Sequence, residues 1–252
     1  RKECCMTGGA IKLDMYLAAP TEAVFTALGE HLRGVLEEHG VDLDGTFAAG
    51  FAAGHVCGIT LATAPEGRYR YLATMVADSP DLPAGYYDSL LVTSAKGGLA
   101  SPADFDPARH RAVINETGSF SGSLTFAAHM KAVHGTTLGD MLRSGAHLKS
   151  IAMVASREAD LAAIDRISFS LARHAAPDDV QGVSVIGRTA SHPGIAFVAD
   201  AGLPEPVIGK LRAAILAFRE EPSWPELQSL LGVSDITVLD PARYAPMASV
   251  AA

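Results

Sequence analysis

The sequence predicts an α/β protein of two lobes, each a mostly parallel sheet flanked by helices. Three observations support this prediction. Of the 252 residues, 48% are hydrophobic and only 19% are charged, so the chain can bury a substantial core. Short apolar runs alternate with segments whose apolar residues recur at helical spacing. A middle section, residues 94–196, carries strand–helix units of its own and is entered and left by strands.

The two crossings into and out of this section set the predicted domain organisation. Lobe 1 is discontinuous and comprises residues 10–93 and 197–252, and lobe 2 comprises residues 94–196. Two lobes joined by two hinge crossings imply a cleft. In open α/β sheets, ligands bind beyond the carboxyl ends of the strands.

Each expected element follows from a local pattern of apolar, turn and breaker residues. Expected strands of lobe 1 span residues 12–17, 69–76 and 86–94, with a further buried strand and tight turn within 47–64. Its expected helices span residues 21–40, 203–220 and 226–231. In lobe 2 we expect strands at 112–114, 159–165 and 183–187, and helices after residues 123 and 150 and over 167–175. A strand at 195–199 would return the chain to lobe 1.

The stretch from Val113 to Ala128 organises the middle section, because a buried strand ends there in a Ser/Gly loop followed by helical spacing. The loop contains Ser119, Ser121, Gly122 and Ser123. The first turn of a helix leaves N–H groups unpaired and favours negative charge, so this layout can hold an anion. The serine hydroxyls would add neutral donors. Taken alone, the loop is more often explained as a helix N-cap.

Three other candidate sites fall at strand-to-helix transitions: His55 with Cys57, His147 and Asp165. Each has an ordinary structural explanation. Surface histidines are commonly solvated, an aspartate at a strand end commonly caps the next helix, and an apolar run commonly buries a cysteine. We expect these residues to gather with the serine loop at the carboxyl edges of the sheets, which favours a ligand site.

Composition excludes several classes of partner. A net charge of −8 without a basic patch argues against nucleic acid and membrane surfaces, although a helix terminus can still bind a small anion. No apolar run is long enough to span a bilayer. The three cysteines, Cys4, Cys5 and Cys57, lack a zinc-binding spacing, and adjacent cysteines rarely bridge each other. We therefore expect no metal and no cofactor.

Several motifs, in this order along the chain, resemble the phosphonate-, phosphite- and phosphate-binding components of ABC importers, a branch of the type 2 periplasmic binding proteins. The resemblance extends from about Lys12 to Pro246. Its most specific block, Asn115 to Gly122, is similar to the family's Asn-x-x-x-Ser-x-Ser-Gly loop. The other similar blocks are Met15-Tyr16, Val56-Cys57-Gly58, Ser144 to Ser150, Ala159 to Asp165, and Gly187 to Gly194.

This resemblance implies roles for the candidate residues. Ser119, Ser121 and Gly122 would hold the oxygens of the anion, and His147 would add a charge-assisted donor if protonated. Asp165 would face the cleft and receive a ligand amine or hydroxyl. The residues expected to line the opposing lobe are Tyr16, His55 and Cys57. Three departures concern the identity of the ligand. Arg188 stands where short members of the family often have Trp, and His55 stands where they often have Gln. The chain between Gly40 and His55 is also shorter than expected for the family.

The function implied is that of an extracytoplasmic solute-binding protein. It would be a monomer in the periplasm, closing by hinge motion on a small oxyanion and delivering it to the membrane subunits of an ABC transporter. Two alternatives remain open. The fold could carry an enzyme in which Cys57 is a nucleophile and His55 its base. It could also serve as a solute sensor that reports to a partner protein.

Overall fold

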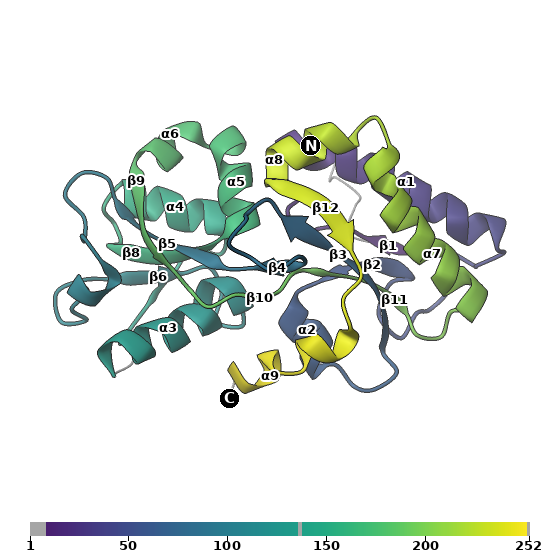
Figure 1. Cartoon of the computed structure of the whole chain (residues 1–252), viewed down its shortest axis with the longest axis horizontal. Helices are drawn as coiled ribbons and strands as arrows, with labels where there is room; N and C mark the ends of the chain where they lie inside the picture. Colours follow the sequence, from purple (N-terminus) through teal and green to yellow (C-terminus); the bar gives the residue numbers. More distant parts are fainter. Residues whose placement is uncertain (1–8, 136–137, 251–252) are drawn as a thin grey trace. The chain divides into compact units, whose positions relative to one another are not determined.

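The computed structural model describes residues 9–135 and 138–250, which form two compact units (Figure 1). Cys4 and Cys5 lie outside the described residues. Of the described residues, 9–86 and 193–248 belong to unit 1, and 87–192 with 249–250 belong to unit 2. The chain passes between the units within two short paired strands, β4 (Tyr86–Tyr87) and β10 (His192–Pro193). The crossings expected from the sequence were at residues 93/94 and 196/197.

Unit 1 contains a five-stranded mixed sheet in the order β1-β2-β11-β3-β12. Its strands are β1 (Ile11–Lys12), β2 (Ala53–Val56), β3 (Tyr69–Ala77), β11 (Ala196–Asp200) and β12 (Val233–Thr237). Strand β11 runs antiparallel between β2 and β3. The returning chain therefore supplies a central strand of this sheet.

Helices cover the sheet of unit 1. Helix α1 (Glu22–Glu38) buries an apolar stripe against the core and packs against α7 (Glu205–Ala217), as Figure 1 shows. The other helical segments of this part of the chain are α2 (Gly58–Thr63), α8 (Trp224–Leu231), α9 (Met247–Val250) and the 3₁₀ turns η1 (Ala19–Thr21), η4 (Phe218–Glu220) and η5 (Pro241–Tyr244). Among the described residues, no helix is both long and apolar enough to cross a membrane.

Unit 2 contains a second five-stranded mixed sheet, in the order β7-β6-β8-β5-β9. Its strands are β5 (Ser89–Ser94), β6 (Ala112–Ile114), β7 (Leu142–Arg143), β8 (Leu161–Asp165) and β9 (Val183–Arg188). Its helical segments are η2 (Pro102–Asp104), the π-helix η3 (Phe120–Leu124), α3 (Thr125–His134), α4 (His147–Ala155), α5 (Arg166–Ala175) and α6 (Pro177–Gln181). Strands β6, β7 and β8 run parallel to one another.

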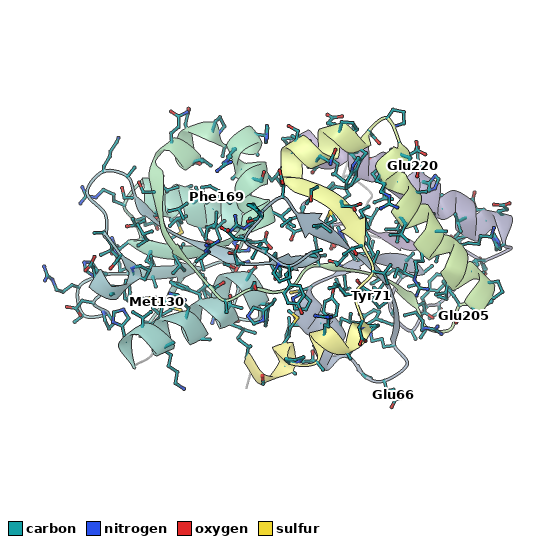
Figure 2. All side chains as sticks on the ribbon, in the orientation of Figure 1. Glu66, Tyr71, Met130, Phe169, Glu205 and Glu220 are labelled. Atoms are coloured by element: carbon teal, nitrogen blue, oxygen red, sulfur yellow. The ribbon has the colours of Figure 1, made fainter. Side chains whose placement is uncertain are left out.

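The sheet of unit 2 is buried on both faces, because successive side chains of its strands point to opposite sides. Ala112 and Ile114 of β6 pack with Met130 of α3 on one face. Val113, between them in sequence, packs on the other face with Phe169 of α5. Figure 2 labels Met130 and Phe169 on either side of this sheet. The loops that follow β6 and β8 are thereby held at one edge, where the candidate site lies.

The two-lobed α/β class is confirmed, with four differences of detail. The sheets are mixed rather than mostly parallel, because β5 and β11 run antiparallel to both of their neighbours. Strand β5, expected in lobe 1, pairs with β8 and β9 and belongs to unit 2. The first strand is shorter than expected, since residues 15–16 already turn. Strand β12 was not predicted.

Candidate functional site

The serine loop follows β6 at the carboxyl edge of the sheet of unit 2. Ser119 is the N-cap of the π-helix, because its Oγ accepts a hydrogen bond from the N–H of Gly122 at 3.2 Å. Its carbonyl accepts from the N–H groups of Ser123 at 3.2 Å and Leu124 at 3.0 Å. The cap explanation of Ser119 is therefore confirmed. Short π-helices are rare and occur frequently at functional sites, so the cap does not exclude a binding role.

Ser121 lies at the centre of a hydrogen-bonded cluster. Its carbonyl accepts from the Ser89 hydroxyl at 2.9 Å and from the Thr125 hydroxyl at 3.0 Å. Its own Oγ lies 3.1 Å from His147 Nε2. The Ser121 residue is 8% exposed and Ser123, in the same turn, is 4% exposed. These contacts hold the backbone and the Oγ of Ser121 in place, which is what a preformed binding site requires.

Gly122 is needed for space rather than for an unusual backbone angle. A Cβ at this position would collide with Asn115 Oδ1 and would lie 2.9 Å from His147 Cε1. Any larger residue would push apart the side chains that meet over the π-helix. The glycine therefore allows Asn115 and His147 to pack directly against the backbone of the loop.

The main chain brings His147 to this position. The segment that precedes α4 continues the parallel pairing of β7 with β6, because the N–H of Ser144 donates to Ile114 O and the N–H of Gly145 donates to Asn115 O, both at 2.9 Å. Helix α4 then begins at His147 itself. The side chain of Asn115 also approaches His147, with Nδ2 at 3.4 Å from Nε2.

His147 is neutral near pH 7. Burial lowers the pKa of its imidazole from 6.5 to about 4. The residue is partly exposed as a whole, but its Nδ1 is buried and, within the described chain, has no hydrogen-bond partner. A position in the first turn of a helix also disfavours positive charge. The conditional expectation of a charge-assisted donor therefore does not hold for this structure.

The neutral imidazole of His147 can carry its proton on either ring nitrogen, and the two tautomers differ in how they hydrogen-bond to Ser121. If Nε2 carries the proton, it donates to Ser121 Oγ and leaves the Ser121 hydroxyl proton free for another acceptor. If Nε2 is unprotonated, Ser121 donates to it instead. Asn115 Oδ1 is also buried without a hydrogen-bond partner in the part of the chain described here. Buried polar groups are rarely left unpaired, and such exceptions are typical of functional sites.

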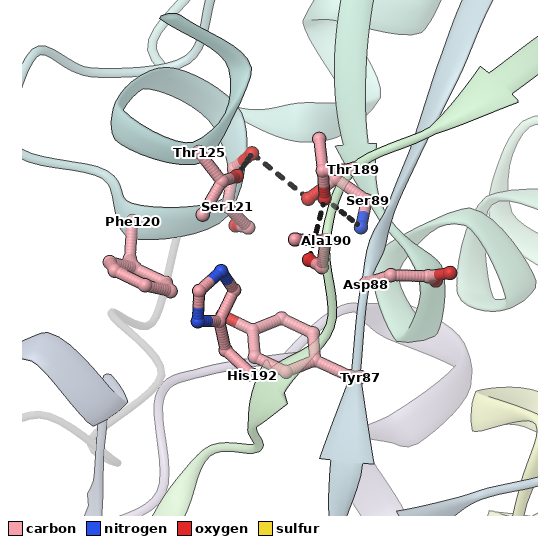
Figure 3. Close-up of a pocket in the computed structure, with 9 residues that line it drawn as sticks. All are labelled: Tyr87, Asp88, Ser89, Phe120, Ser121, Thr125, Thr189, Ala190 and His192. Atoms are coloured by element: carbon pink, nitrogen blue, oxygen red, sulfur yellow. Dashed lines mark hydrogen bonds between the residues drawn. The ribbon is translucent and has the colours of Figure 1, made fainter. Parts of the chain in front are cut away.

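A narrow depression in unit 2, which has no room for a water molecule, adjoins Ser121. Hydroxyl-bearing side chains lie on its upper side in Figure 3, and the rings of Tyr87, Phe120 and His192 lie below. The hydroxyl side consists of Ser89, Ser121, Thr125 and Thr189. Except for Ser121, these lining residues were not among the sequence candidates. Ser89, Thr125 and Thr189 sit at or just past the ends of elements, which is the one sequence signal they carry.

Asp165 ends β8 and caps α5, since its carboxylate accepts from the N–H of Ser168 at 2.9 Å. The ordinary explanation of this residue is therefore confirmed. Asp165 is 3% exposed and lies opposite Ser89 in the pairing of β5 with β8. The structure thus brings Asp165 to the same sheet edge as the Ser121 cluster.

A buried ion pair stands beside these residues and was not predicted. Arg166 donates from Nε and Nη2 to the two carboxylate oxygens of Asp88 at 2.7 and 2.9 Å. The Asp88 side chain is 1% exposed and that of Arg166 is 22% exposed. The pair links the start of β5 to the start of α5, the two places that position Ser89 and Asp165.

His55 occupies the core of unit 1 and not a ligand surface. It is 0% exposed, and its Nε2 accepts from the N–H of Met15 at 2.9 Å. Burial lowers its pKa from 6.5 to about 3, so the neutral ring carries its proton on Nδ1. The expectation that His55 lines the site is therefore wrong. The ring holds the turn that contains Tyr16, whose φ of 65° is uncommon for a residue other than glycine.

Cys57 is partly exposed and immediately precedes α2. It lines a cleft of about 560 Å³ within unit 1, together with Met15, Lys12, Asp14, Phe51, Arg68 and Tyr69 and four smaller or aliphatic residues. The enzyme hypothesis required His55 as a base for Cys57. The buried ring of His55 instead accepts from Met15, so this pair is not assembled in the structure.

No cluster of three or more His, Cys, Asp or Glu side chains that could hold a metal ion occurs in residues 9–135 and 138–250. The polar groups at the serine loop are hydroxyls, an amide, backbone N–H groups and a neutral imidazole. These groups suit an oxyanion, because they can donate hydrogen bonds without carrying formal charge.

Known proteins resemble this chain in sequence pattern and in fold. Residues 54–244 match the family model described as ABC transporter, phosphonate, periplasmic substrate-binding protein. A comparison with curated proteins finds no match.

Solved structures share the fold at low identity. The binding protein component of an ABC phosphonate transporter from Pseudomonas aeruginosa is 16% identical with a TM-score of 0.74, over 95% of this chain and 84% of that one. PhnD1 from Prochlorococcus marinus, in complex with methylphosphonate, is 14% identical with a TM-score of 0.64, over 88% and 81%. A Xanthomonas citri protein bound to ATP is 16% identical with a TM-score of 0.65, over 88% and 90%.

Proposed function

The chain belongs to the family of periplasmic substrate-binding proteins of phosphonate ABC transporters, and from this premise we propose that it captures a small phosphonate or related oxyanion on the serine loop of unit 2. The observation that carries the proposal is the Ser121 cluster. A buried hydroxyl at the start of a π-helix lies 3.1 Å from a neutral histidine, and the adjacent residue, Gly122, has no room for a side chain.

The cluster supports a specific arrangement of donors. With its proton on Nε2, His147 donates to Ser121 Oγ, and the Ser121 hydroxyl then donates to an oxygen of the ligand. The hydroxyls of Ser119 and Ser123 and the first N–H groups of the π-helix add further donors. All of these groups are neutral. Binding would therefore depend on aligned dipoles in a buried site, where hydrogen bonds are stronger than in water.

The other predicted residues have supporting parts in this proposal. Asp165, beside Ser89, would accept a hydrogen bond from an amine or hydroxyl on the organic part of the ligand. Cys57 and Tyr16 belong to unit 1, where Cys57 lines a cleft of about 560 Å³. His55 would act only through the turn at Met15 and Tyr16, which it holds by a hydrogen bond.

The proposed ligand class is an oxyanion with a small substituent. The methylphosphonate in the Prochlorococcus marinus protein supports this class. The ATP in the Xanthomonas citri protein makes nucleotides a necessary comparison. Membership of the family supports a place in the periplasm and delivery to the membrane subunits of an ABC transporter.

Isothermal titration calorimetry on the purified protein tests the proposal. Methylphosphonate, phosphite, phosphate, sulfate and ATP would be titrated separately, and native mass spectrometry would show any ligand that co-purifies. We expect at least one small phosphorus oxyanion to bind with a stoichiometry near one. Absence of binding by all of the phosphorus oxyanions would overturn the proposal.

A further inference from the structure

We propose that the cleft of about 560 Å³ in unit 1 is a second ligand site, which takes a small organic anion with one negative charge and an apolar body. The residues that line it all belong to unit 1, whereas the serine loop belongs to unit 2. The inference is therefore independent of the proposed function. Ligand clefts commonly measure about 300–1,000 Å³, so this cleft has room for a small molecule.

The main chain around the cleft is fixed by hydrogen bonds, so the site is preformed. At one end, the N–H of Arg68 donates to Pro65 O at 3.2 Å, and Arg68 O accepts from the N–H of Ala201 at 3.3 Å. At the turn after β1, the N–H of Met15 donates to the buried ring of His55 at 2.9 Å. The segment that enters β2, residues 41–52, is described throughout and forms turns without a helix or strand.

Much of the lining is apolar. The rings of Phe51 and Tyr69 are stacked, with centroids 6.1 Å apart and planes at 26°. Phe51 precedes β2 and Tyr69 begins β3, so the two rings join neighbouring parts of the sheet. Met15, Ala49 and Val56 add aliphatic surface. An apolar body placed in the cleft would be removed from water against these side chains, which favours binding.

Three charged residues line the cleft, and they leave one positive charge in excess. Lys12 Nζ lies 2.9 Å from Asp14 Oδ1, so these two charges offset each other. The guanidinium carbon of Arg68 lies 5.5 Å from the centroid of the Tyr69 ring. Within the described chain, no carboxylate forms an ion pair with Arg68. Its contact with the ring places the cation beside the apolar lining without neutralising it.

This combination selects an organic anion rather than an inorganic one. The planar guanidinium of Arg68 can donate two parallel hydrogen bonds to a carboxylate. A small inorganic anion would leave the rings of Phe51 and Tyr69 without a partner. A second negative charge on the ligand would be opposed by Asp14, which lines the same cleft. The favoured ligand is therefore a monocarboxylate whose body is aromatic or aliphatic.

Two variants of Arg68 test the inference in the full chain. Arg68→Gln removes the charge, whereas Arg68→Lys keeps the charge and loses the planar fork. Arg33→Gln is the matched control, because Arg33 is exposed on α1 and does not line the cleft. Phenylacetate, hexanoate, acetate and the neutral phenylacetamide would each be titrated into ¹⁵N-labelled protein. Amide chemical shifts report both the affinity and the place of binding, and thermal unfolding confirms that each variant folds.

We expect phenylacetate or hexanoate to shift the amide signals of Thr60, Arg68 and Tyr69. Acetate, which lacks an apolar body, and phenylacetamide, which lacks the charge, should bind at least about fivefold more weakly. Arg68→Gln should weaken the better anion about fivefold and leave phenylacetamide within about twofold. Arg68→Lys should retain part of the preference for the anion, and Arg33→Gln should match the wild type.

Several results would overturn the inference. They are shifts confined to the serine loop, equal affinities for phenylacetate and phenylacetamide, a wild-type affinity in Arg68→Gln, or an Arg68→Lys variant as weak as Arg68→Gln. Failure of all four probes to bind would overturn it as well. None of these results concerns the affinity for methylphosphonate or phosphate, which tests the proposed function separately.

Discussion

The buried histidines of the two units share a neutral charge state but differ in what surrounds them. His55 lies between the rings of Phe25 and Phe197, at 5.7 Å from each, and accepts from a main-chain N–H. His147 lies among an amide, a hydroxyl and a glycine. The first environment makes a core residue and the second a candidate binding residue. The identity of the contacting groups, and not burial, separates the two roles.

Ser121→Ala tests the central hydroxyl of the proposed site. The change removes a donor to a charged oxygen, so binding of the preferred oxyanion should weaken by about 1–3 kcal/mol. Calorimetry measures the loss, with Ser156→Ala as the control because Ser156 is exposed near the end of α4. An unchanged affinity in Ser121→Ala would remove this residue from the proposed donor set.

Gly122→Ala tests whether the absence of a side chain matters. The added Cβ would force Asn115 or His147 away from the π-helix, and overpacking of this kind costs about 1–3 kcal/mol of stability. Both the melting temperature and the oxyanion affinity should fall. Gly118→Ala is the matched control in the same loop, because a Cβ there meets nothing within 4 Å. If Gly122→Ala and Gly118→Ala had the same melting temperature and the same oxyanion affinity, the packing argument would be contradicted.

The pH dependence of stability follows from the lowered pKa of His55. Its pKa is about 3 in the folded protein and 6.5 as the ordinary value. Between these values the unfolded chain binds more protons, so the free energy of unfolding is highest above pH 6.5 and falls as the pH drops. The slope from one such residue reaches about 1.4 kcal/mol per pH unit.

Urea unfolding at several pH values from 7.5 down to 4.5 measures this slope. His55→Gln keeps an acceptor for the N–H of Met15 and removes the titrating group, so the slope should become shallower even if the protein is less stable at pH 7.5. His31→Gln, on the exposed surface of α1, should retain the wild-type slope. A slope that does not change in His55→Gln would show that other groups govern the acid sensitivity.

At the scale of elements, two separate interactions meet at the start of α5: a helix cap and an ion pair. Asp165 caps the helix, and the next residue, Arg166, pairs with Asp88 at the start of β5. These contacts fix where β8 ends and where β5 begins, and with them the positions of Ser89 and Asp165. A cap that also faces a ligand would carry two roles on one carboxylate.

Substitutions of Asp165 separate the two roles. Asparagine caps helices about as well as aspartate, so Asp165→Asn should change stability by less than about 0.5 kcal/mol, whereas Asp165→Ala should cost about 0.5–2 kcal/mol. If the carboxylate also receives a ligand amine, Asp165→Asn should weaken 2-aminoethylphosphonate more than methylphosphonate. Urea unfolding and calorimetry measure the two effects. Parallel losses of both ligands would restrict Asp165 to its capping role.

At the scale of the whole molecule, the sequence was informative wherever local pattern and function coincide. The buried strand at residues 112–114, the serine loop and the helix after it were all predicted, because periodicity and turn chemistry are local. Strand direction was not predictable in the same way. The antiparallel insertion of β11 between β2 and β3 depends on pairings between distant segments.

The residues of the candidate site also divide into those that a local motif predicts and those that only the pairing of distant segments brings there. Ser119, Ser121, Gly122 and His147 stand in recognisable motifs, and the structure brings them together. The residues Ser89, Thr189 and His192 have no motif, and each reaches the depression only through the pairing of distant strands or the packing of a ring. The charge state of His147 could not be predicted from the sequence either, because it depends on how deeply the folded chain buries the imidazole.

Unit 2 should fold without unit 1. Its main segment, residues 87–192, is continuous and contains two apolar clusters of its own, one on each face of its sheet. A fragment of these residues should show helical and strand signals by circular dichroism and a single cooperative transition in urea. A fragment of residues 9–86, which lacks β11 and β12, should show no such transition. Cooperative unfolding of that second fragment would contradict this view of unit 1.

Because β11 is a central strand of the sheet of unit 1, the two sheets can be completed only in a fixed order during translation. Residues 87–192 leave the ribosome together and can complete their sheet while the rest of the chain is still being made. Strands β2 and β3 emerge earlier but have no hydrogen-bonded neighbour between them until residues 196–200 follow. Until then, their unpaired edges can join other chains. The unit whose first segment is synthesised earliest is thus the unit that finishes folding last.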